Sequence, residues 1–126
     1  MKKPSICFDK SIEFSLAIIK CTSRIAKEKH EYTMTKQLLR SGTSIGANIY
    51  EGIYAQSKPD FIHKYSLALK EAKESSYWLK LLKDTNYLNK SESENLTRLN
   101  NDLINLLSTS IRTAKENLKK SNSSTK

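Results

Sequence analysis

The residues of this chain whose types and spacing could support chemistry lie in two neighbouring stretches. The first, LRSGTSIGANIYEG from Leu39 to Gly52, contains all three glycines of the chain. A glycine-rich segment of this kind can hold a phosphate with its backbone amides. The second contains Glu71 and Glu74, a pair of carboxylates that could act as a general acid and a general base. Each possibility requires further residues at defined positions.

The glycine-rich stretch does not meet the requirements of a phosphate loop. Such a loop needs Gly-x-x-x-x-Gly-Lys followed by Ser or Thr after a strand, and here the spacing from Gly42 is wrong and no lysine follows. The dinucleotide pattern Gly-x-Gly-x-x-Gly is also absent. Gly42 and Gly46 are four residues apart, so in a helix they share a face with small neighbours. We interpret the stretch as a closely packed helix, with a kink or a backbone contact to a ligand as the alternatives.

The carboxylate pair has no supporting catalytic group. No His, Cys or metal-ligand set accompanies Glu71 and Glu74, and the Glu-x-x-His motif of di-metal bundles is absent. Cys7 and Cys21 lack the His or Cys neighbours of a zinc site, and we interpret them as packing residues with reduced thiols. We therefore expect no enzymatic activity, no cofactor and no metal.

The polar residues of these stretches form stripes at helical spacing. Arg40, Ser44, Asn48 and Glu51 follow steps of four, four and three. Further along, Glu71 and Glu74 alternate with large apolar residues that include Trp78. These residues could make exposed ion pairs of little energetic weight, or a hydrogen-bonded network at a helix or subunit seam. We predict the network, and its orientation toward the same subunit, another subunit or a ligand stays open. Its members are Arg40, Ser44, Asn48, Glu51, Glu71, Glu74 and Trp78.

The chain is strongly basic, which favours polyanionic partners. It has 22 Lys and Arg against 13 Asp and Glu, a formal charge of +9. One stripe predicted to face outward contains the candidate nucleic-acid contacts His63, Lys70, Lys73, Tyr77 and Lys80. Lysines can contact phosphates there, and the two rings could stack on unpaired bases. Lysines also cover the surface of ordinary bundles, so the charge alone does not decide between the two interpretations.

Apolar residues recur at helical spacing through most of the chain. A first helix is predicted over 11–29, where Ile12, Leu16, Ile19 and the pair Ile25 and Ala26 recur at three- and four-residue steps, and a second over 35–56. The predicted caps are Asp9 or Ser11, Thr35, Ser57, and a Ser91–Glu94 capping box.

The third helix begins near Ser57 and has coiled-coil spacing, and the fourth covers 91–118. The heptad positions of the third are Phe61, Tyr65, Ala68, Ala72, Ser75, Leu79 and Leu82. The fourth has two apolar stripes, so either it is deeply buried or one stripe meets another subunit. We predict an all-α, antiparallel up-down-up-down four-helix bundle as a single domain over 1–118, with a disordered polar tail over 119–126.

Neither a long apolar run nor a secretory leader is present, so we expect a cytoplasmic protein that does not enter a membrane.

The stretch from Leu39 to Gly52, with FIHKYSLALKEAKESSYWLKLL after it, resembles the bacterial family of proteins encoded in intervening sequences of 23S rRNA genes. That resemblance implies an antiparallel four-helix bundle that assembles as a homopentameric ring. A related protein, the accessory variability determinant of diversity-generating retroelements, works with a reverse transcriptase and its template RNA. Where many relatives have a Gly-Ser pair this chain has Lys70-Glu71, so the resemblance does not carry over a small-residue contact at this position.

Two functions follow as expectations. The first is a non-enzymatic, pentameric bundle that binds RNA or another nucleic acid through surface lysines. The second is a protein-interaction scaffold, for example a reverse-transcriptase accessory subunit, with no direct contact to nucleic acid. Binding that weakens steeply with salt distinguishes the first from the second.

Overall fold

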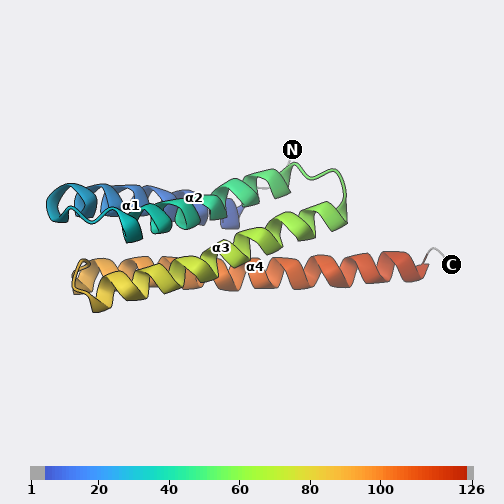
Figure 1. Ribbon diagram of the computed structural model, residues 1–126. Coiled ribbons are helices and arrows are strands. Elements are labelled where there is room, and N and C mark those ends of the chain that lie inside the picture. The colour runs from blue at the N-terminus through green and yellow to red at the C-terminus, as the bar shows by residue number, and fades with distance from the viewer. Residues whose placement is uncertain (1–4, 125–126) are drawn as a thin grey trace.

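The computed structural model describes residues 5–124, which form four helices joined by short connections. These are α1 (Ile6–Lys29), α2 (Thr33–Ile53), α3 (Lys58–Asp84) and α4 (Lys90–Ser124). Figure 1 shows that successive helices run in opposite directions. The prediction of an all-α four-helix bundle is confirmed.

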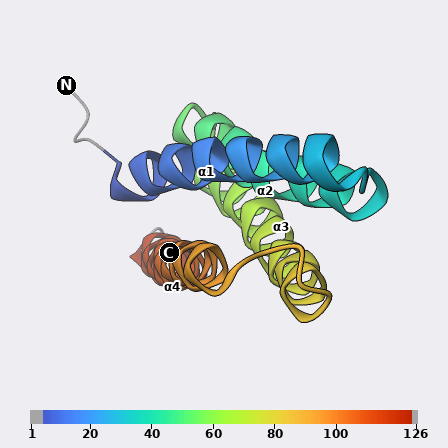
Figure 2. The same cartoon turned by 90° about the vertical axis from the view of Figure 1, so that its left-hand side faces the viewer.

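The helices pack in chain order, and α1 returns to contact α4. In Figure 2 α4 is seen end-on while α1 runs across the view, so the α1–α2 pair crosses α4 obliquely. The ion pair between Arg24 and Glu92 joins α1 to α4, with Nη2 of the arginine donating to both carboxylate oxygens at 2.6 and 2.7 Å. The far end of α4 continues past the other helices in Figure 1.

The cap of α3 is the predicted one, whereas those of α1 and α2 are not. Ser57 accepts a hydrogen bond from the backbone N–H three residues further on. α1 begins earlier than predicted because Ser5, and not Asp9 or Ser11, caps it. At α2 the carboxylate of Glu31 accepts from three successive backbone N–H groups, at 2.9–3.1 Å, so Thr35 is inside the helix and not its cap. A single carboxylate therefore satisfies three of the four amides that a helix start leaves without partners.

Of the apolar stripe predicted on α1, Ile25 is buried, whereas its first three members are exposed. Ile12, Leu16 and Ile19 are 43, 56 and 43 % exposed. The core-facing apolar residues are Cys7, Phe14, Ile18, Cys21 and Ile25. Both sets follow helical spacing, so the periodicity alone could not identify the inner one. Burial raises the pKa of both cysteine thiols to about 11.

The glycines of α2 lie where neighbouring helices approach closely. A Cβ at Gly42 would lie 3.1 Å from Cγ2 of Ile18, and one at Gly46 would lie 3.0 Å from Oγ of Ser11. Both neighbours belong to α1. No glycine in the described residues has a positive φ, so these positions are small to allow packing and not to permit a turn. This confirms the interpretation of close helix packing.

The heptad positions of α3 are buried as predicted, except that Phe61 is only partly buried.

On α4 the capping box lies two residues before the predicted one: the side chain of Asn89 accepts from the N–H of Glu92 at 2.8 Å. α4 also continues to Ser124, so 119–124 are helical where the sequence predicted a disordered tail. Lys119 and Lys120 are good helix formers, which favours the helix as far as Lys120. The last two residues lie outside the described range. None of the described helices combines the length and apolarity needed to cross a membrane.

Candidate nucleic-acid interface

Four of the seven residues predicted to form a polar network meet between α2 and α3. The guanidinium of Arg40 donates to both carboxylate oxygens of Glu71, at 3.2 and 3.3 Å, and to Oε2 of Glu74. The indole N–H of Trp78 donates to the same oxygen of Glu74 at 3.0 Å. One residue further along each helix, the hydroxyls of the buried Ser41 and Ser75 lie 2.9 Å apart. The network therefore links two helices of one subunit.

The interactions within this cluster favour the ionised forms of Arg40 and Glu74. Hydrogen bonds from Trp78 and then from Arg40 lower the pKa of Glu74, and the bond to Glu74 is the largest cause that raises the pKa of Arg40. An ionised carboxylate held by an arginine is a poor general acid, so the geometry does not resemble a catalytic pair. The side chain of Arg40 is 47 % exposed, and its pairs contribute about 1 kcal/mol at most.

The other three predicted members bond elsewhere. Ser44 donates to the backbone carbonyl of Arg40, and Asn48 donates to that of Ser44, so both turn back onto their own helix. Glu51 pairs with Lys64 of α3 at 2.9 Å and does not reach Glu71 or Glu74. Lys64 is the partner that the sequence reasoning missed, and the four-residue steps of α2 gave no signal for it.

The candidate nucleic-acid contacts lie where the sequence placed them, on one exposed face of α3. All five residues, His63, Lys70, Lys73, Tyr77 and Lys80, are exposed. Lys80 pairs with Asp84 at 2.9 Å, but both groups are more than half exposed. The ring of Tyr77 contacts that of Trp78 edge-on, with centroids 4.9 Å apart, so this face adjoins the polar network.

The sequence reasoning missed a second set of cations. Arg112, Lys115 and Lys119 are exposed on α4 and are spaced three and four residues apart, which places them on one face. No ion pair is made by any of the three among the side chains that the structure describes. Their spacing of three and four residues is a signal in the sequence itself, although the two apolar stripes dominate the pattern of this helix.

An exposed apolar face on α1 and α2 was missed as well. On α1 it contains Ile12, Leu16 and Ile19. On α2 it contains the exposed Leu39 and Tyr50, which are eleven residues apart and so share a helix face, and the ring of Tyr50 contacts that of Phe8 of α1, with centroids 5.8 Å apart. We call these residues the α1–α2 outer face. Its large apolar side chains are unusually exposed for a surface that meets only water.

No group of three or more His, Cys, Asp or Glu residues in the described part of the chain could hold a metal ion.

Comparison with known proteins gives a family and a fold. The family model described as 23S rRNA-intervening sequence protein matches residues 3–109. No curated protein matches the chain. A crystal structure of a protein of unknown function from the S23 ribosomal protein family of Bacteroides thetaiotaomicron is similar, with 44 % identity and a TM-score of 0.83. The match covers 84 % of this chain and 98 % of that one.

Proposed function

This chain belongs to the 23S rRNA-intervening sequence protein family, and from that premise we propose that it is a non-enzymatic, homo-oligomeric bundle that binds RNA in the cytoplasm. The observation that carries the proposal is the net charge of +9 together with the exposed cationic face of α3. A surface of this sign attracts phosphate backbones over long range, and assembly multiplies its charge.

The α1–α2 outer face supports the homo-oligomer. Large apolar side chains on adjacent helices, with Ile12, Leu16 and Ile19 about half exposed, are typical of a surface that another subunit covers. We assign this face to the contacts of a ring of five subunits, the assembly that the family resemblance implies. Its apolar character also suits a partner protein, which keeps the interaction scaffold as the second candidate function.

The oligomer is tested by sedimentation of Ile12→Lys combined with Leu16→Lys. Buried lysines would cost several kcal/mol at such a contact, so the variant should sediment as a monomer that keeps its helical circular dichroism. Ile6→Lys is the matched control, because Ile6 is 67 % exposed on α1 but six residues from Ile12, and so on another face. A wild-type monomer at micromolar concentration would contradict the assembly.

RNA binding is tested by titrating structured RNA at several salt concentrations. We expect log K to fall linearly with log salt, because lysines that contact phosphates release counterions. The triple variant Lys70→Glu, Lys73→Glu and Lys80→Glu should bind more weakly while its oligomeric state stays unchanged. If the protein binds no RNA at low ionic strength, the RNA-binding proposal is wrong. The protein-interaction scaffold then remains as the candidate function, with a reverse transcriptase as one class of partner to test.

A further inference from the structure

Two hollows lie in line along one side of the seam between α3 and α4. One, of about 460 Å³, is lined by Leu69 of α3 and by Ser108, Arg112, Lys115 and Lys119 of α4. The other, of about 240 Å³, is lined by Ser76, Lys80 and Lys83 of α3 and by Thr97 and Asn101 of α4.

The hollows share a side because their linings share helix faces. On α3 the residues Leu69, Ser76, Lys80 and Lys83 are separated by seven, four and three positions. On α4 the residues Thr97, Asn101, Ser108, Arg112, Lys115 and Lys119 are separated by four, seven, four, three and four. Such steps keep side chains on one face of a helix. We call the two hollows together the α3–α4 furrow.

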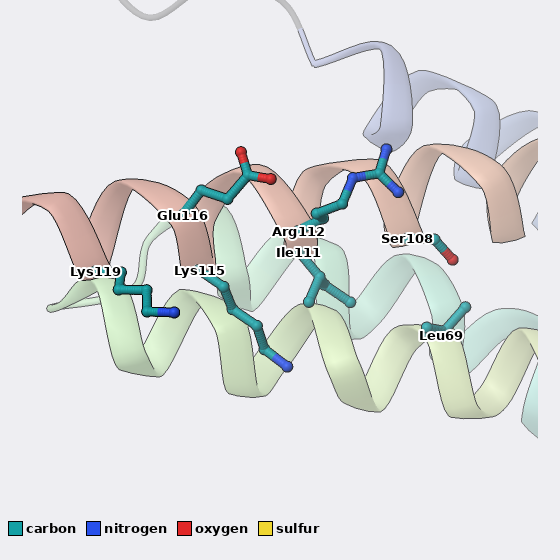
Figure 3. A pocket seen from close by; sticks show the side chains of 7 residues that line it. All are labelled: Leu69, Ser108, Ile111, Arg112, Lys115, Glu116 and Lys119. Carbon is teal, nitrogen blue, oxygen red and sulfur yellow. The ribbon is translucent and has the colours of Figure 1, made fainter.

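The furrow carries positive charge toward both of its ends. Its lining contains five cations, Lys80, Lys83, Arg112, Lys115 and Lys119, and one carboxylate, Glu116. All five cations are exposed, and among the described side chains only Lys80 makes an ion pair. Figure 3 shows Lys115 and Lys119 extending from α4 toward α3, both to the same side of Leu69 and Ile111, whereas Arg112 and Glu116 extend from α4 away from α3. From Thr97 to Lys119 the row extends about 33 Å, at 1.5 Å per residue.

We propose that the α3–α4 furrow binds an unpaired RNA strand, an inference that rests on the proposed RNA-binding function and assigns it a site. The cations contact the phosphates, and bases enter the space between the helices. Leu69 and Ile111 give the wider hollow an apolar floor on which a base can pack. A duplex keeps its bases stacked inside and offers mainly phosphates, so it would leave this floor in contact with water.

The narrower hollow has the polar groups that single-strand recognition uses. Hydroxyl and amide side chains there can contact base edges and the ribose 2′-hydroxyl. Asn100 also lines it, is 1 % exposed, and donates from Nδ2 to the carbonyl of Ala72 and the hydroxyl of Ser76. Its Oδ1 is the only buried side-chain N or O atom without a partner among the described residues. This alternation of apolar and polar floor fits a nucleotide chain better than an amphipathic acidic helix, which needs a continuous apolar groove.

The test compares two variants that each lose three positive charges. One is Arg112→Gln, Lys115→Gln and Lys119→Gln in the furrow, and the control is Lys27→Gln, Lys29→Gln and Lys36→Gln, three exposed lysines near the α1–α2 turn. The probe is a short fluorescent oligouridine, followed by anisotropy against salt, with a duplex RNA and polyglutamate as competitors. Glutamine preserves helix propensity, and circular dichroism checks that both variants fold.

Each phosphate contact on a single strand contributes about 0.7 to the slope of log K against log salt. The furrow variant should therefore bind more weakly and lose about 2 from that slope, whereas the control should match the wild type. Equal slopes for the two variants would overturn the site and leave RNA binding elsewhere on the protein. A duplex that competes as well as the single strand would overturn recognition of an unpaired strand, and polyglutamate that competes equally would point to an acidic protein. A wild type that binds no RNA at low salt would overturn the proposed function and the site together.

Discussion

Replacing Gly52 by alanine should destabilise the bundle although alanine is the better helix former. Gly52 is the penultimate residue of α2, so the substitution by itself stabilises by less than the figure of about 1 kcal/mol for a helix interior. Here the new Cβ would lie 2.6 Å from two ring carbons of Tyr65. Tyr65 is 4 % exposed, and its ring packs against that of Phe61 at a tilt of 31° with centroids 4.1 Å apart, so the ring has little room to move. Overpacking of this kind costs about 1–3 kcal/mol.

We expect a net loss of about 1–2 kcal/mol, since a blocked aromatic ring places the cost in the upper part of that range. Urea unfolding followed by circular dichroism measures this loss, at a fixed protein concentration because the stability of the proposed homo-oligomer would depend on concentration. The same substitution in a Tyr65→Leu background removes the clash, and there it should be neutral or stabilising. The double-mutant cycle isolates the contact. A Gly52→Ala protein more stable than the wild type, or an equal loss in both backgrounds, would refute the packing argument.

Three further predictions concern single groups. Glu31→Gln should cost about 1 kcal/mol by weakening the cap of α2, measured by urea unfolding at pH 7; no loss would mean that solvent satisfies those amides equally well. The pKa of Glu74 is lowered from its ordinary value of 4.5, so its stabilisation is present above pH 4.5 and is lost as pH falls through the lower folded value. Glu74→Gln should therefore flatten unfolding free energy against pH below about 4.5, and an unchanged curve would contradict the pairing. Native Cys7 and Cys21 should react slowly with a thiol reagent at pH 8, since burial raises the pKa of each to about 11, and fast native labelling would contradict that burial.

Much of the fold could be predicted because several segments have a single consistent pattern. α3 has one heptad face and an N-terminal Ser57, and both are where the pattern placed them. The small residues of α2 indicated a close helix approach, which Gly42 and Gly46 make with α1. In these elements local propensity and burial favour the same arrangement.

The site was predictable only in part, because side-chain pairing depends on which helix lies opposite. Arg40, Glu71, Glu74 and Trp78 meet as a network, yet Glu51 pairs with Lys64 because α3 brings that lysine within reach. The stripes at four-residue steps identify residues that share a face and do not identify the partner across the gap.

The sequence by itself determined the helical class, the four segments, the basic charge and the close-packed face of α2, since each depends on composition or on spacing along the chain. Only the tertiary structure decided which of two apolar stripes on α1 faces the core and that Ile12, Leu16 and Ile19 stay outside. It also brought the cations of α3 and α4 to the same seam. The physical reason is that periodicity defines the faces of a single helix, whereas burial and a shared furrow are properties of pairs of helices.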